Sequence, residues 1–300
     1  MRFAWRGGAT FACAVCCACS PAVAPPAPKA SSASVSVNAP IASVAIAPKH
    51  NTLPALDASQ FLSALSLERS AKLQPGTLEL LAPSYAGSNL GELNARKLLL
   101  QRSSDGRILV HQGWPNYDAS LLPVTERETR CSFVADCDEP VVQRVEGALR
   151  KIHPTPSARD VVEFVAQFIS HKHMSRGFDI ASVVAQRREG DCTEHAVLTT
   201  ALMRASGIPS HIVTGVALVQ VQDRLLAFGH AWTEYHDGKS WQLADATNVS
   251  EPRPAMAYLP LRVMQNEGAG YSRGQLTGFD VVDITTVSVP ENLKLSALSR

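Results

Sequence analysis

The chain has 300 residues, 45% of them hydrophobic, so it is long enough for one large or two small domains and can form a core. Its formal net charge is +1 and no lysine or arginine block stands out, so the charge gives no argument for a nucleic-acid partner. No apolar stretch approaches the roughly 20 residues that a membrane-spanning helix needs.

Residues 1–19 have the layout of an export signal, because two arginines precede an uncharged stretch of small residues. Four cysteines close this stretch: Cys13, Cys16, Cys17 and Cys19. The segment resembles a bacterial lipoprotein signal, in which cleavage occurs before a cysteine that carries lipid, and Ala18 favours Cys19 as that residue. Cys16 stands where such signals usually have leucine, so Cys16 and Cys17 stay open as lipid sites. An ordinary cysteine-rich signal peptide is the alternative.

The rest of the chain keeps only three cysteines. In an oxidising compartment the neighbouring Cys131 and Cys137 can form a disulfide, although two local cysteines can also both stay reduced. Cys192 is then the odd cysteine, a pattern that marks a free and reactive thiol.

Residues 20–55 are rich in proline, alanine and serine, so we expect an extended tether there. Residues 56–135 form a smaller mixed or β-rich region to which the sequence assigns no role. Within it we expect a helix over 62–73 and short strands over 97–101 and 107–112.

Residues 136–300 carry the clearest signals and are predicted to form the catalytic domain. Helices are expected over 140–151, from an N-cap at Ser157 to residue 171, and over 192–206, where Gly207 ends the last one. Strands are expected over 211–221, 225–235, 239–246, 258–263 and 280–289.

Cys192 falls at the first turn of the third helix. Helix N-termini offer unpaired N–H groups and a partial positive charge, which stabilise a thiolate and can hold a developing oxyanion. The position therefore suits a nucleophilic cysteine, and the side chain of Asp191 is placed to cap the helix.

A hairpin brings two further polar residues together. Asp237-Gly238 favours a two-residue type I′ turn, and if the register runs on without a bulge, His230 and Asp245 are directly opposed. Opposed Cβ atoms lie roughly 4.5–5.5 Å apart, which suits a histidine–carboxylate hydrogen bond. Trp232 shares the strand face of His230 and is predicted to be a wall of the site.

These three residues have the chemistry of a cysteine-nucleophile triad. Cys192 would attack an acyl carbon, His230 would move the proton, and Asp245 would fix the ring tautomer. Gln186, upstream of the nucleophile, is the candidate for a second oxyanion donor.

Four blocks of the sequence resemble the motifs of the transglutaminase-like superfamily. They are Gly-Asp-Cys-Thr-Glu-His-Ala at 190–196, Arg-Ala-Ser-Gly-Ile-Pro at 204–209, Gly-His-Ala-Trp at 229–232 and Trp-Gln-Leu-Ala-Asp-Ala-Thr at 241–247. The resemblance covers about residues 140–250 and departs from many members at Glu189, where they have a second glycine. It implies an α+β, papain-like fold with the cysteine helix packed on an antiparallel sheet, and thiol-based acyl transfer or amide hydrolysis without a metal or other cofactor.

Other roles for the polar residues are weaker. A metal site at the triad lacks a close-spaced ligand pair, His171 and His173 fit a polar helix end better than a metal site, and His195 is a neighbour of the site. The sequence thus predicts an exported, lipid-anchored cysteine peptidase, amidase or transglutaminase-type enzyme acting on peptides or proteins in the periplasm or cell envelope. The alternative is a non-catalytic envelope scaffold with the same fold.

Overall fold

The computed structural model describes residues 69–70, 76–82, 96, 99–102, 108–114, 117, 119–172, 179–222, 224–249, 256–271 and 287–288. The chain divides into two compact units, 1–35 and 36–300, and all described residues belong to the second unit. The predicted signal and tether therefore lie outside the described residues. The predicted boundaries at 19, 55 and 135 stay predictions.

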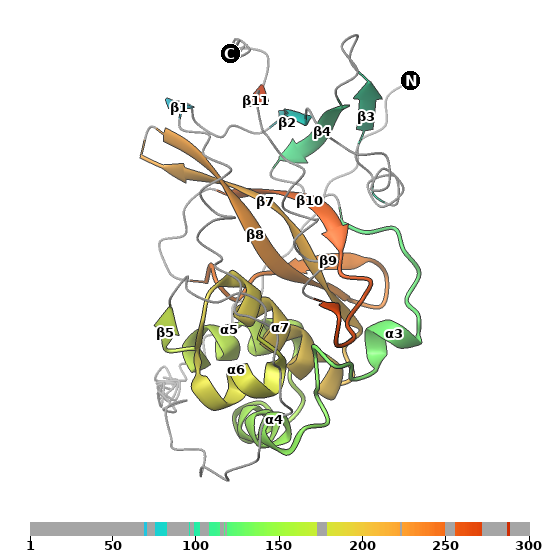
Figure 1. Ribbon diagram of the computed structural model, residues 1–300, viewed down its shortest axis with the longest axis vertical. Coiled ribbons are helices and arrows are strands. Elements are labelled where there is room, and N and C mark those ends of the chain that lie inside the picture. Colours follow the sequence, from blue (N-terminus) through green and yellow to red (C-terminus); the bar gives the residue numbers. More distant parts are fainter. Residues whose placement is uncertain are drawn as a thin grey trace, which may run out of the picture. The chain divides into compact units, whose positions relative to one another are not determined.

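An antiparallel sheet forms the centre of the described structure (Figure 1). Its strands are hydrogen-bonded in the order β1–β8–β7–β10, and β9 also pairs with β8. These strands are β1 (Arg69–Ser70), β7 (Ser210–Val221), β8 (Arg224–His236), β9 (Trp241–Ala244) and β10 (Met256–Val263). The four strands predicted between residues 211 and 263 are thus confirmed, with β9 shorter than expected.

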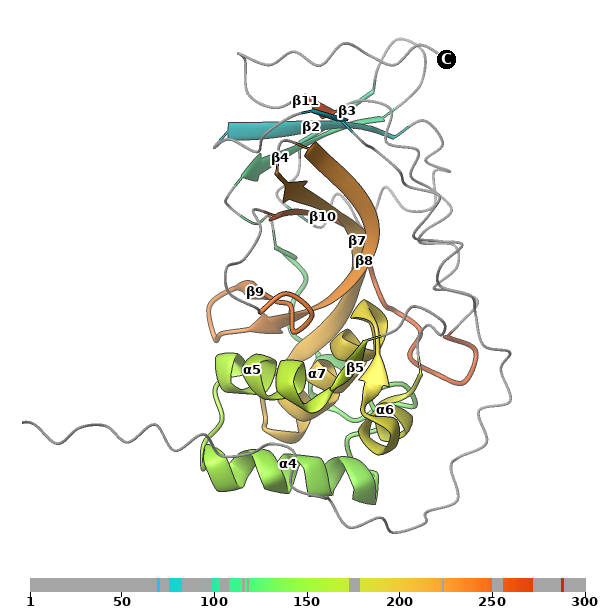
Figure 2. The same cartoon turned by 90° about the vertical axis from the view of Figure 1, so that its left-hand side faces the viewer.

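Helices gather around α7 beside this sheet, as Figures 1 and 2 show. The helices are α3 (Glu126–Thr129), α4 (Pro140–Ile152), α5 (Ala158–Phe168), α6 (Ala181–Arg187) and α7 (Cys192–Ala205). Helix α7 packs on β7 and β8 and is also contacted by α4, α5 and α6. Nearly all of its side chains are buried, as expected of a helix with neighbours on every side.

Local capping chemistry explains where α5 and α7 begin. Ser157 and Asp160 form a capping box at α5, and Asp191 and Glu194 form one at α7. Gly207, with a φ of 79°, follows α7 in the left-handed region that favours glycine. The three predicted helices are confirmed, except that α5 ends at Phe168 and His171–Lys172 forms the short strand β5.

Successive side chains of β8 pack into two different hydrophobic cores. Ala231 belongs to the large apolar core under the helices, whereas Trp232 lies in a second core with Val213, Tyr258 and Val263. Since side chains alternate along a strand, His230 points to the same side as Trp232. This second core therefore lies on the His230 face of β8, whereas Cys192 belongs to the large core.

Three strands before residue 115 and one near residue 287 form a second antiparallel sheet in the order β11–β2–β4–β3. Its strands are β2 (Gly76–Ala82), β3 (Leu99–Arg102), β4 (Ile108–Trp114) and β11 (Val287–Ser288). The strands predicted over 97–101 and 107–112 are confirmed as β3 and β4. The helix predicted over 62–73 is wrong where the structure describes it: Arg69–Ser70 pairs with β8 as β1, because strand pairing overrides a local helical pattern. Of the strand predicted over 280–289, only β11 lies in the described residues.

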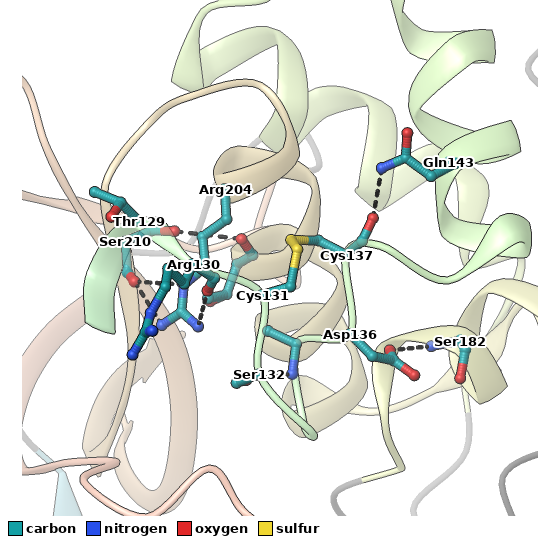
Figure 3. The surroundings of a disulfide bond; sticks show 12 residues. Thr129, Arg130, Cys131, Ser132, Asp136, Cys137, Gln143, Ser182, Arg204 and Ser210 are labelled. Atoms are coloured by element: carbon teal, nitrogen blue, oxygen red, sulfur yellow. Dashed lines mark hydrogen bonds between the residues drawn. A yellow bond between two sulfur atoms is a disulfide. The ribbon is translucent and has the colours of Figure 1, made fainter. Parts of the chain in front are cut away.

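A disulfide joins Cys131 and Cys137 in the loop before α4 (Figure 3). The loop holds the neighbouring helices: Ser182 N–H, in the first turn of α6, donates to Asp136 Oδ1 at 2.8 Å, and Gln143 Nε2 of α4 donates to the Cys137 carbonyl at 2.6 Å. Arg204 of α7 donates to the carbonyl of Arg130 at 3.1 Å. The disulfide loop is therefore a junction between three helices.

The fold is α+β with the Cys192 helix packed on an antiparallel sheet, so the predicted fold class is confirmed. No helix within the part of the chain that the structure describes has the length and apolar character to cross a membrane.

Candidate active site

Cys192 is the first residue of α7 and is 8% exposed. Asp191 precedes it as the N-cap, with its Oδ1 accepting a hydrogen bond from the Thr193 N–H at 2.8 Å. Glu194 completes the capping box, because its Oε2 accepts from the Asp191 N–H at 3.0 Å. The predicted helix start and the cap at Asp191 are thus observed.

Gly190 allows the chain to enter α7 in this way. Its φ is 153°, and a Cβ at this position would lie 2.3 Å from the Cβ of Glu194. Any other residue would therefore clash with the capping carboxylate. Glu189, the departure from the superfamily motif, pairs with His171 where β6 (Glu189–Gly190) meets β5.

His230 and Asp245 are hydrogen-bonded, with 2.9 Å between His230 Nε2 and Asp245 Oδ2. They are not directly opposed, so the predicted register is wrong. His236 pairs with Trp241 and Thr233 pairs with Ala244, which leaves a four-residue loop where a two-residue turn was expected.

The Asp237 side chain explains the longer loop. Its Oδ1 accepts from the N–H groups of Lys239 and Ser240, both at 2.8 Å, and Gly238 adopts a φ of 94°. The resulting two-residue displacement keeps every side chain on its predicted face. His230 and Asp245 therefore still meet, as diagonal neighbours, with Asp245 just past the end of β9.

The His230 ring and the Ala231 backbone N–H both act on the Cys192 thiol. Burial raises the pKa of the Cys192 thiol and the Asp191 carboxylate adds to this, while His230 and the Ala231 N–H each lower it. The sequence suggested a lowered thiol pKa at the helix N-terminus, and burial opposes that expectation. The charge of His230 is therefore a main contribution in favour of the thiolate.

The ring of His230 is held in its charged form. Burial alone would lower its pKa, but Asp245 and the Cys192 thiolate raise the pKa of His230 to about 10. The pKa of Asp245 falls to about 2, because His230, Tyr258 and Thr247 outweigh its burial. This geometry favours a charged His230 ring backed by an ionised Asp245 carboxylate, whereas burial raises the pKa of the Cys192 thiol on balance.

Aromatic rings enclose the histidine. The His230 ring stacks on Trp232 with centroids 5.9 Å apart, and Tyr258 lies at the same centroid distance. Trp232 Nε1 donates to the Tyr117 hydroxyl at 2.8 Å. The structure thus places Trp232 beside the predicted site, fully buried, and adds two tyrosines that the sequence did not single out.

A cavity of about 590 Å³ adjoins the site on the Asp245 side. Its lining includes Val162 of α5, Leu243 of β9, Met256 of β10, and both Asp245 and Tyr258. Asp245 and Tyr258 thus line this cavity, whereas Cys192 and His230 do not.

The other residues that the sequence analysis considered for the site are not members of the triad. Gln186 is exposed on α6, and its role as an oxyanion donor stays a prediction. His195 is buried, its Nδ1 is 2.6 Å from the Asp191 carbonyl, and burial lowers its pKa, which makes it a neutral neighbour of the site. His171 lies on β5 and His173 lies outside the described residues. Among the described residues no three His, Cys, Asp or Glu side chains are grouped to hold a metal ion.

Residues 143–246 match the family model of the transglutaminase-like superfamily. This segment contains α7, the hairpin and all three residues of the predicted triad. The segment is therefore a transglutaminase-like domain. No curated protein matches the chain.

Solved structures with low sequence identity are also similar. One, from Cytophaga hutchinsonii and proposed to be a cysteine protease, is 13% identical, with 69% of this chain and 86% of that chain covered and a TM-score of 0.39. Another is the periplasmic domain of TgpA from Pseudomonas aeruginosa bound to ethylmercury, which is 16% identical, with 66% and 78% covered and a TM-score of 0.39.

Proposed function

We propose that the protein is an exported thiol enzyme that cleaves or transfers acyl groups from peptide or protein amides through Cys192. The observation that carries this proposal is the 2.9 Å contact between His230 and Asp245, with Cys192 at a helix N-terminus interacting with the same ring. The transglutaminase-like domain that spans these residues supports it.

The geometry suits acyl transfer in two steps. The Cys192 thiolate attacks the amide carbon, and the backbone N–H of Cys192, which the Asp191 cap does not use, stabilises the oxyanion. His230 imidazolium gives its proton to the departing amine, which leaves a thioester on Cys192. Water or a second amine then attacks the thioester while His230 takes the proton. Asp245 holds the ring throughout. We favour water as acceptor, that is, a cysteine peptidase or amidase.

Two features support export. The first is the predicted signal, whose lipid attachment at Cys19 would anchor the protein at the membrane. The second is the disulfide Cys131–Cys137, because such a bond persists in an oxidising compartment. The substrate would then be a peptide or protein of the periplasm or cell envelope.

The rate of Cys192 alkylation by iodoacetamide tests the proposal, with mass spectrometry of the Cys192 peptide from the full chain as readout. At pH 6 to 7 we expect wild type to react about 10²-fold faster than His230→Ala, because only His230 offsets the burial of the thiol to this extent. Asp245→Asn should fall between them. His171→Ala, which removes an exposed histidine, is the matched control. Equal rates in wild type and His230→Ala would favour the non-catalytic envelope scaffold.

A further inference from the structure

Asp245 has three hydrogen-bond donors, and two of them come from outside the transglutaminase-like segment, the neighbouring Thr247 and the distant Tyr258. His230 Nε2 and the Tyr258 hydroxyl both donate to Oδ2, at 2.9 and 2.8 Å, and the Thr247 N–H donates to Oδ1 at 2.9 Å. Tyr258 belongs to β10, beyond residue 246 where the family match ends.

The position of Tyr258 is fixed by its strand and its neighbours. Its backbone pairs with Ala217 of β7, and its ring packs edge-on against Trp232 with centroids 5.3 Å apart. The side chain is 9% exposed, so its hydroxyl donates to the carboxylate in a largely dry environment. A donor held this firmly can restrict the rotation of the carboxylate it contacts.

Asp245 needs such a restraint because it lies outside regular structure. Strand β9 ends at Ala244, so no ladder hydrogen bond on β9 orients the residue. Its Oδ2 must nevertheless stay 2.9 Å from the His230 ring. Tyr258 is the side chain that reaches the same oxygen from β10, which pairs with β7 and not with β9.

We propose that Tyr258 is a positioning residue that holds Asp245 Oδ2 toward His230 and thereby keeps the imidazolium available to Cys192. The proposal rests on the proposed function, since it assigns a role within the same triad. Tyr258 itself contacts the carboxylate and does not take part in the transfer of the acyl group. It acts as the second layer of support that keeps a reacting group in place.

The test is a double-mutant cycle between Tyr258→Phe and Asp245→Ala in the full chain, read out as the pH profile of Cys192 alkylation. Tyr258→Phe keeps the ring and its packing, so we expect a thermal midpoint close to wild type. Alkylation at pH 6 should slow about threefold to tenfold, the effect of losing one typical hydrogen bond. In the Asp245→Ala background the same change should have no further effect, because the residue acts through Asp245.

A second readout does not depend on the reactivity of the thiol. The titration of His230 can be followed by NMR, and the His230→Ala variant assigns the signal. We expect this titration to move to lower pH in Tyr258→Phe. Tyr117→Phe is the matched control: its hydroxyl is bonded to Trp232 and Glu234 and should leave the titration in place. If Asp245→Ala does not fold, Asp245→Asn replaces it in the cycle.

An unshifted His230 titration, or an equal loss of rate in both backgrounds, would overturn the role of Tyr258 while leaving the triad intact. Equal alkylation of wild type and His230→Ala would instead remove the proposed function. In that case the NMR titration still decides whether Tyr258 positions the His230–Asp245 pair.

Discussion

Arg96 and Glu234, 138 residues apart in the sequence, form a buried ion pair with 2.6 Å between Nη1 and Oε1. Glu234 also accepts from the Tyr117 hydroxyl at 2.7 Å and pairs with His211 Nε2 at 2.6 Å. These contacts hold the pKa of Glu234 at about 2 against the effect of burial. These contacts join Arg96 and Tyr117 to Glu234 of β8. Glu234 follows Trp232 by two positions and His230 by four.

Removing the Arg96 guanidinium should therefore destabilise the whole fold. We expect Arg96→Ala to lower the free energy of unfolding by about 3–5 kcal/mol, because a buried carboxylate loses its cationic partner. Urea unfolding at pH 7 measures this. Arg159→Ala, which removes an exposed partner of Glu163, is the control and should leave stability close to that of wild type. Similar small losses in both variants would show that the Arg96 contact is not needed for folding.

The sequence predicted the centre of the site better than its surroundings. The start of α7 depends on neighbours in sequence, Asp191 and Glu194, so its cap could be anticipated. The His230–Asp245 contact was predicted from a two-residue turn whose register is wrong, and it survives because a two-residue displacement keeps both side chains on the same face. The length of the loop was not predicted correctly, because it depends on the side chain of Asp237 as well as on the turn type.

Long-range partners left no local signal. Tyr117 reaches Trp232 across 115 residues and Tyr258 reaches Asp245 from β10, which does not pair with β9, so neither contact follows from periodicity. The strand at 258–263 was predicted, but its register against β7, which includes an irregularity between Pro260 and Arg262, was not available from the pattern. The two tyrosines that the sequence analysis missed are therefore positioned by tertiary contacts.

Glu194 should make stability depend on pH. Burial and the nearby Asp191 carboxylate raise the pKa of Glu194 from 4.5 to about 8. The folded state then binds this proton more tightly than the unfolded state, so stability should fall as pH rises from 4.5 to 8, with a slope of at most about 1.4 kcal/mol per pH unit.

Glu194→Gln isolates this effect because glutamine stays neutral. Urea unfolding of both proteins at pH 5, 6, 7 and 8 should show a stability difference that shifts in favour of the variant as pH rises. His230, whose pKa is raised to about 10, also makes stability fall with pH, between 6.5 and 10, but equally in both proteins. A difference that is constant with pH would show that Glu194 is ionised in the folded protein throughout.

The disulfide should contribute to stability without taking part in the chemistry. Cys131 and Cys137 are six residues apart, and closing so short a loop is worth about 2 kcal/mol. We expect the Cys131→Ser, Cys137→Ser double variant to lose about that much in urea unfolding while its Cys192 alkylation rate at 25 °C stays within twofold of wild type. A large fall in that rate in still-folded protein would mean that the disulfide loop, through α6, also positions the nucleophile.

The lipid anchor can be tested independently of the enzyme. Metabolic labelling with palmitate in a bacterial host should mark the wild-type chain, and Cys19→Ala should abolish the label, because Ala18 and Cys19 fit the cleavage site of a lipoprotein signal. Cys13→Ala is the matched control and should keep it. A label retained in Cys19→Ala would move the lipid to Cys16 or Cys17, and the two further single variants would separate them. A wild-type chain that is exported, retains its disulfide and takes up no label would have an ordinary signal peptide.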